Sequence, residues 1–253
     1  MKKYRNLQQA LIFVISIFTF NSVCFAQNPA GEKAPETLLS LLIKGGPVMI
    51  PLLICSIVAL TVIIERFISL KKQKIIPTGF AVELKEKLRD CTPEDLNNTV
   101  AFCDSHMSPM ARIIKAGISR CKSERRVAEI EETLEDVAGR EIRTLKGSLQ
   151  GLKIIAAISP LLGLLGTVYG MINAFQTVAN ATAGVAKAER LAAGIYEAMV
   201  TTATGLTIAI PVLLIYYFLS YRIDRNMSEF ELICDDFIDV YIDNQRKTNL
   251  EKK

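Results

Sequence analysis

The stretch GIYEAMVTTATGLTIAIP (residues 194–211) contains one carboxylate and several hydroxyls in an otherwise apolar segment. Its acid, Glu197, is followed by an uncharged run that continues to residue 221. Two more uncharged runs occupy residues 47–64 and 154–186. A membrane-spanning helix needs about 20 mostly apolar residues, or about 17 at the short end, so each run is long enough to span. The sequence therefore predicts an all-α membrane protein with three transmembrane helices.

The N-terminus has the layout of a secretory signal peptide. Three basic residues precede a short apolar stretch, 11–20, and the small residues Cys24 and Ala26 then stand just before a cleavage point. We expect cleavage after Ala26, which would leave the mature N-terminus in the periplasm. The alternative is an uncleaved N-terminal anchor.

Basic residues predict the orientation of the spans in the membrane. Four of them lie within 66–74, at the end of the first run, and Arg222 and Arg225 follow the third. Because Lys and Arg are enriched in cytoplasmic segments, these ends and the C-terminus are expected in the cytoplasm. The expected segments are a signal peptide (1–26), a periplasmic leader with an interfacial helix (27–46), transmembrane helices (47–68, 151–182 and 195–221), a cytoplasmic helical domain (69–150), a periplasmic hairpin (183–194) and a cytoplasmic helical tail (222–253).

Helix signals extend beyond the membrane. Thr92-Pro93 and Ser108-Pro109 each combine an N-cap hydroxyl with proline at the first helical position, and so predict two helix starts. Apolar residues recur mostly at three- and four-residue steps over 127–152, which predicts a long amphipathic helix that continues into the second span. Three glycines weaken that helix: Gly139, Gly147 and Gly151. A second helical stripe follows the third span: Phe230, Ile233, Phe237 and Val240.

No arrangement of residues indicates an enzyme, a metal site or a cofactor site. His106 is the only histidine, and the six cysteines form no Cys-x-x-Cys pair. Four of those cysteines fall in the expected cytoplasmic segments, where disulfides are rare. The net charge of +4 is small and both signs are interleaved, which argues against nucleic-acid binding.

The second span contains SPLLGLLGTVYGMINAF (159–175). Glycines in a span allow close helix contact, and a proline removes one backbone donor and adjusts the helix locally. A phosphate loop is excluded because no Lys–Ser/Thr pair follows the glycines. Thr167 could either satisfy its hydroxyl against its own backbone or line a polar path. The expected helix-packing residues are Gly163, Gly166, Gly170, Gly205 and Pro160.

Glu197 gives the sharpest functional signal. A charged residue near the centre of a span costs about 2.5–3.5 kcal/mol on insertion scales, so such residues usually face a bundle interior or water. Close to the outer end, it could instead extend its carboxylate to the membrane surface. On a helical wheel Thr201, Thr204 and Ile208 share its face. Thr202 lies about 140° away, so the period alone favours Thr201 over Thr202 on that face.

These motifs resemble those of the MotA/TolQ/ExbB proton channel family, and its ExbB branch most closely. The resemblance covers nearly all of the mature chain, and the two signature spans are highly specific in combination. The similar segments are LLIKGGPVMIPLLICSIVALTVIIERF (41–67), SPMARIIKAGI (108–118), ISPLLGLLGTVYGMINAF (158–175) and GIYEAMVTTATGLTIAIP.

The resemblance implies a homo-oligomeric pore, pentameric in the family, around the single spans of ExbD-type subunits in membrane lipid. It implies that the complex passes protons and drives a TonB-type protein, which opens outer-membrane receptors for siderophores and vitamin B12. It implies a pore lining of Thr167, Thr202 and Glu197, with Thr201 as an added hydroxyl beside Thr202. A carboxylate of the ExbD-type span would carry the proton.

Other interpretations remain open at this stage. A TolQ-like subunit would energise the Tol–Pal envelope system, although TolQ relatives usually lack a cleavable signal and leader. A flagellar or gliding stator is less favoured, because a flagellar one would normally carry four spans. From a different class, the chain could be a passive membrane scaffold whose threonines satisfy only helix contacts.

Overall fold

The computed structural model describes residues 45–77, 79–88, 93–122, 126–179 and 185–251. The expected signal peptide and nearly all of the expected leader lie outside these residues. All regular secondary structure within them is helical. The helices are α3 (Met49–Ser69), α4 (Lys72–Ile75), α5 (Phe80–Lys87), α6 (Pro93–Ser105), α7 (Pro109–Cys121), α8 (Val127–Gly147), α9 (Gln150–Ala179) and α10 (Val185–Glu251).

The chain divides into two units, and α10 contributes to both. The apolar unit comprises the described residues of 45–65 and 150–217, and the charged unit those of 66–149 and 218–251. Three helical stretches are long and apolar enough to cross a membrane, as the sequence predicts: Met49–Ser69 and parts of Val127–Ala179 and Ala188–Arg246. By length and composition, the chain is a helical membrane protein with three candidate spans.

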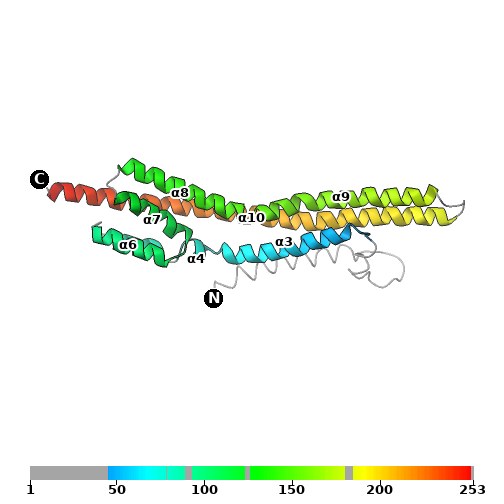
Figure 1. Cartoon of the computed structure of the whole chain (residues 1–253), viewed down its shortest axis with the longest axis horizontal. Coiled ribbons are helices and arrows are strands. Elements are labelled where there is room, and N and C mark those ends of the chain that lie inside the picture. The colour runs from blue at the N-terminus through cyan, green and yellow to red at the C-terminus, as the bar shows by residue number, and fades with distance from the viewer. Residues whose placement is uncertain (1–44, 78, 89–92, 123–125, 180–184, 252–253) are drawn as a thin grey trace. The chain divides into compact units, whose positions relative to one another are not determined.

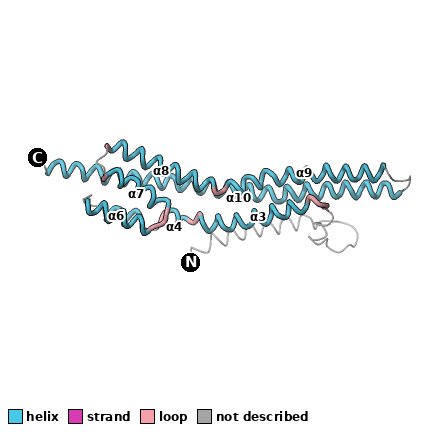
Figure 2. The backbone as a smooth tube through the Cα atoms, viewed as in Figure 1, coloured by secondary structure: helices cyan, strands magenta, loops and turns pink. Residues whose placement is uncertain are grey.

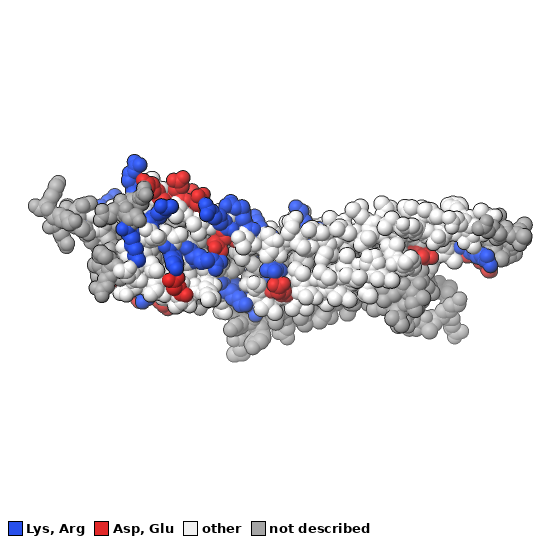
Figure 3. Space-filling model, in the orientation of Figure 1, with Lys and Arg blue, Asp and Glu red and all other residues white. Residues whose placement is uncertain are grey.

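In the apolar unit, α9 and the first part of α10 lie antiparallel and side by side (Figures 1 and 2). α3 packs on this pair through Met49 and Leu52, which form an apolar cluster with Val200 of α10. Large apolar side chains cover the outside, among them Leu161 of α9 and Ile210 of α10. The visible face of this unit is almost free of charged side chains, as contact with lipid requires (Figure 3).

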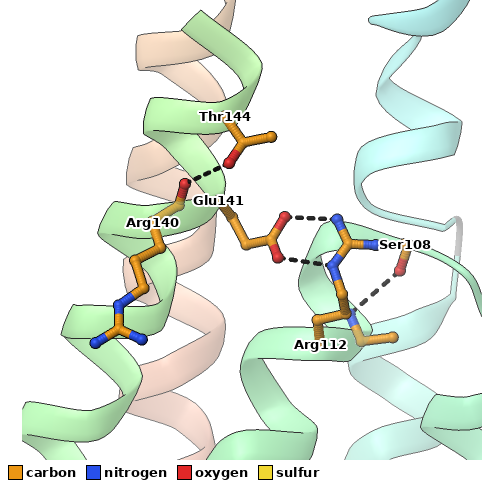
Figure 4. A network of polar contacts seen from close by, with 6 residues as sticks. Ser108, Arg112, Arg140, Glu141 and Thr144 are labelled. Carbon is orange, nitrogen blue, oxygen red and sulfur yellow. Dashed lines mark hydrogen bonds and ion pairs between the residues drawn. The ribbon is translucent and has the colours of Figure 1, made fainter. Parts of the chain in front are cut away.

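In the charged unit, α7 and α8 pack together, and Lys, Arg, Asp and Glu cover the visible face (Figure 3). Ser108 caps α7: its Oγ accepts a hydrogen bond from the Ala111 N–H at 3.2 Å, and Pro109 is the first helical residue, which confirms this predicted start. Arg112 donates from Nε and Nη2 to Oε1 and Oε2 of Glu141, at 2.7 and 2.5 Å (Figure 4). This paired hydrogen bond ties α7 to α8 and raises the pKa of the Arg112 guanidinium.

The second part of α10 buries a helical stripe in the charged unit. Of the four residues predicted for this stripe, Phe230 and Phe237 are buried, and Ile233 and Val240 are half-buried. The same helix carries the third candidate span, so the stripe and that span belong to one helix, as the sequence predicts.

The path between α8 and α9 differs from the expected continuous helix. α8 ends at Gly147 and α9 begins at Gln150, with a turn at residues 148–149 between them. Glycine costs roughly 1 kcal/mol relative to alanine inside a helix, so Gly147 is a weak point at which a helix can end.

Two other helix starts bear on the sequence predictions. α6 begins at Pro93, as predicted, and its expected cap Thr92 lies outside the described residues. α10 begins at Val185, so most of the segment expected as a hairpin, 183–194, is already helical. The third span is therefore the middle of a longer helix.

Candidate functional site

A seam of small residues joins α9 to α10 in the apolar unit. A β-carbon added to Gly205 would lie 2.6 Å from the Ser159 carbonyl oxygen. One added to Gly163 would lie 3.0 Å from the backbone of Thr201 and Thr202. Because backbone atoms cannot move away as a side-chain end can, position 205 requires glycine, and position 163 leaves little room for any larger residue. The residues of the seam are Ser159, Gly163, Gly166, Gly170 and Ala174 of α9, and Gly194, Ala198, Thr201 and Gly205 of α10.

Pro160 lies within α9, next to this seam. Its neighbour Ser159 is completely buried and donates from Oγ to the Ile155 carbonyl at 2.8 Å. A hydroxyl bonded in this way satisfies its polar atom without leaving its own helix.

Thr201, the residue that the helical wheel favours, lies inside the seam. It is only 1% exposed, and its side chain lies against Gly166, whose added β-carbon would be 2.4 Å from Oγ1. Oγ1 donates to the Ala198 carbonyl at 2.8 Å and makes a longer contact of 3.5 Å with the Gly163 carbonyl. Part of the face that the wheel identifies as polar is thus buried against α9 of the same chain.

Thr202 lies at the edge of the seam and is half-buried. Its Oγ1 donates to the Gly163 carbonyl at 3.1 Å, a hydrogen bond between the two helices. Thr167 follows Gly163 by about one turn of α9, is half-buried, and donates to the Leu164 carbonyl at 2.7 Å. The structure therefore brings Thr167 and Thr202 to neighbouring turns of adjacent helices.

Glu197 lies one turn nearer the start of α10 and is half-buried. Its carboxylate lies against Gly46, where an added β-carbon would be 2.0 Å from Oε1. Gly46 has a left-handed backbone, with φ of +68°. The sequence does not predict this contact.

The described residues contain no group of three or more His, Cys, Asp and Glu side chains that could hold a metal ion. His106 lies beside the rings of Phe80 and Phe102, with centroid distances of 6.0 and 4.6 Å. Its Nδ1 is 3.1 Å from the Phe102 carbonyl oxygen. These contacts are those of a packed loop residue.

Comparisons with known proteins identify relatives along most of the chain. Residues 105–232 match the model of the MotA/TolQ/ExbB proton channel family. The biopolymer transport protein exbB1 of Vibrio cholerae is 31% identical over 201 residues, which cover 78% of this chain and 85% of that protein. An ExbB-like protein of Synechocystis is 31% identical over 86% of this chain and 85% of its own length. The Tol–Pal system protein TolQ of Haemophilus influenzae is 37% identical over 39% of this chain and 42% of its own length.

Proposed function

The chain belongs to the MotA/TolQ/ExbB proton channel family, and we propose that it is an inner-membrane channel subunit of a TonB system. Together with an ExbD-type partner, it uses the proton motive force to energise a TonB-type protein. That protein in turn drives outer-membrane transport of siderophores and vitamin B12. The observation that carries the proposal is the group of Thr167, Thr202 and Glu197 along the α9–α10 pair in an otherwise apolar unit.

The proposed mechanism uses these side chains as a polar lining. Hydroxyls both donate and accept hydrogen bonds, so Thr167 and Thr202 can stabilise a proton carrier that passes through a low-dielectric region. Glu197 contributes charge near the outer end and relays or orients the proton. The driving force is about 2.3 kcal/mol per unit charge for each 100 mV of membrane potential.

The proposed assembly is a homo-oligomer, pentameric as in the family, that encloses the spans of the ExbD-type partner. The large apolar side chains that remain exposed on the apolar unit are available for contact with lipid or with neighbouring copies. The proposed orientation places the mature N-terminus in the periplasm and the C-terminus in the cytoplasm, following the basic residues at 66–74 and after 221.

A TolQ-like role in the Tol–Pal system is the second candidate. It is favoured by the similarity to TolQ proteins of Haemophilus influenzae and Pseudomonas aeruginosa, each 37% identical over 98 residues. The signal-like N-terminus and the longer match to exbB1 favour the TonB system.

Uptake of a labelled ferric siderophore tests the proposal. A strain deleted for this chain should lose uptake, and the wild-type chain should restore it. Unchanged uptake accompanied by detergent sensitivity and a division defect would instead support the Tol–Pal role.

Proton flux into liposomes, measured on the chain purified with its membrane partner, separates a channel from a passive scaffold. The proposal expects flux that depends on the pH gradient. A complex that assembles but stays proton-tight would contradict a channel role.

A further inference from the structure

The carboxylate of Glu197 occupies a space that exists only because residue 46 is glycine. A β-carbon on Gly46 would lie 2.0 Å from Oε1 of Glu197 and 3.1 Å from its Cδ. The first distance is far below van der Waals contact, and the second is a few tenths of an ångström short of it. The positive φ of Gly46, +68°, also disfavours most L-residues at this position. Asparagine is one of the few that tolerate this left-handed backbone.

The turn that carries Gly46 is fixed to α3. The Gly46 carbonyl accepts a hydrogen bond from the Met49 N–H at 3.1 Å, and the Pro47 carbonyl accepts one from the Ile50 N–H at 3.3 Å. Met49 is also the first residue of α3 and packs in the apolar cluster with Val200, one turn from Glu197 on α10. The backbone hydrogen bonds thus hold the Gly46 turn to α3, and the Met49–Val200 contact holds α3 beside the turn of α10 that carries Glu197.

The position is also electrostatically favourable. α3 has no acidic residue in its own first turn. A carboxylate near the N-terminal turn of a helix typically gains stability from the helix dipole and the free N–H groups. Glu197 supplies such a carboxylate from another helix.

We propose that Gly46 is a positioning residue for Glu197: the turn before α3 receives the carboxylate and sets the direction in which it faces. The turn that precedes the first span thereby sets the position of an acidic side chain on the third span. The effect on proton flux rests on the proposed function, whereas the placement of the carboxylate does not.

Neighbouring Gly45 provides a matched control. The three atoms nearest to a β-carbon there all belong to the flexible side chain of Met49, with Cγ at 2.5 Å, and none belongs to Glu197. Gly45→Ala thus adds a methyl group to the same turn without reaching Glu197.

The direct test is the rate at which a hydrophobic carbodiimide modifies Glu197 in the full-length assembled protein, measured by peptide mass spectrometry. Gly46→Asn keeps the left-handed backbone but fills the space, so the displaced carboxylate should react severalfold faster than in the wild type. Gly45→Ala should leave the rate unchanged. Equal rates in Gly46→Asn and wild type would overturn the proposal.

A compensating variant keeps the test decisive if Gly46→Asn does not assemble. Glu197→Asp shortens the acid by one methylene and makes room for a β-carbon at position 46. The double variant should then restore assembly, and its failure to do so would count against the proposal.

Proton flux supplies the functional readout. Gly46→Asn should shift the pH profile of flux, and adding Glu197→Asp should move the profile back toward that of the wild type. A wild-type complex without any flux would refute the channel function, while the modification rates would still decide the role of Gly46.

Discussion

The four hydroxyls that follow Glu197 have four different environments. Thr201 is buried between α9 and α10, and Thr202 bonds across them to Gly163. Thr204 donates to the Val200 carbonyl of its own helix at 2.8 Å, and Thr207 is exposed. Thr202 makes the shorter hydrogen bond to Gly163 on the neighbouring helix, 3.1 Å against 3.5 Å for Thr201, and it is the less buried of the two. It is therefore the stronger candidate partner for Thr167.

We expect the double variant Thr167→Val/Thr202→Val to assemble but to lose energised siderophore uptake. Valine has nearly the shape of threonine, and a hydrogen bond in a membrane protein contributes only about 0.6 kcal/mol on average, so the fold should persist. Chromatography of the purified protein and uptake in complemented cells measure the two effects. Thr177→Val, which removes a similar hydroxyl bonded to Asn173 on α9, is the control. Full uptake in the double variant would refute the role of the two threonines.

Two thiols of the charged unit should be chemically silent. Burial raises the pKa of Cys103 to about 11 and that of Cys234 to about 12, with nearby carboxylates adding to the shift. At pH 8 neither thiol should be alkylated by iodoacetamide until the protein is denatured, because the thiolate is the reactive form. Rapid alkylation of the native chain at either thiol would contradict their burial.

The same two thiols make stability depend on pH. Thiols in the unfolded chain ionise near the ordinary cysteine pKa of 9.0, at lower pH than those of the folded chain. The unfolded state therefore loses protons first, and the free energy of unfolding should fall as pH rises from about 9 toward 11. Unfolding midpoints of the wild type and of a Cys103→Ala/Cys234→Ala variant, compared across this range, should converge as pH rises.

At the scale of helices, the seam between α9 and α10 follows a repeat that is visible in the sequence. The small residues of α9 recur at steps of four and three, and those of α10 do the same from Gly194 to Gly205. Such spacing keeps one face of each helix toward its partner. The sequence therefore predicts which residues of each helix can make close contacts. It does not predict that these two helix faces pack against each other.

Alanine at a seam glycine and alanine at an exposed glycine should change the stability of the protein in opposite directions. Gly205→Ala forces a β-carbon against the Ser159 carbonyl oxygen, and overpacking of this kind costs roughly 1–3 kcal/mol. Gly151→Ala, also in a helix of the apolar unit, meets no atom within 4 Å and should stabilise α9 by about 0.5–1 kcal/mol. Thermal unfolding in detergent should show a lower midpoint for the first variant and an equal or higher one for the second. A Gly205→Ala protein as stable as the wild type would show that the seam is not tightly packed.

Capping signals and the apolar stripes of α8 and of the second part of α10 predicted the structure well, whereas the helical wheel of the third span did not show which threonine is buried. Ser108 and Pro109 form the predicted cap because capping depends on adjacent residues alone. Thr201 was favoured for the polar face, yet it is buried, because a wheel gives angles between side chains and not the direction of the neighbouring helix. Gly46 could not have been linked to Glu197 from sequence, since the contact joins segments that are far apart in the chain.

At the scale of the whole molecule, the distribution of charged residues distinguishes a unit suited to lipid from a unit suited to water. The described apolar unit exposes mainly large apolar side chains, and the charged unit carries exposed ion pairs such as Lys146–Asp224 and Lys115–Asp104. Isolated exposed pairs contribute little to stability, so these charges matter chiefly for solubility and for orientation in the membrane.

That orientation can be tested with two single cysteines. Ala188 and Met107 are both exposed, the latter to 96%, and they lie in the apolar and charged units respectively. In spheroplasts, a membrane-impermeant maleimide should label Ala188→Cys at once, whereas Met107→Cys should be labelled only after lysis. In the proposed orientation, the basic residues after α3 keep the charged unit on the cytoplasmic side, out of reach of the reagent. The unsubstituted chain measures labelling of the native cysteines, of which Cys103, Cys121 and Cys234 are buried. Labelling of Met107→Cys in intact spheroplasts, with Ala188→Cys protected, would show that the topology is the reverse of the proposed one. The proton gradient would then act on the complex in the opposite direction.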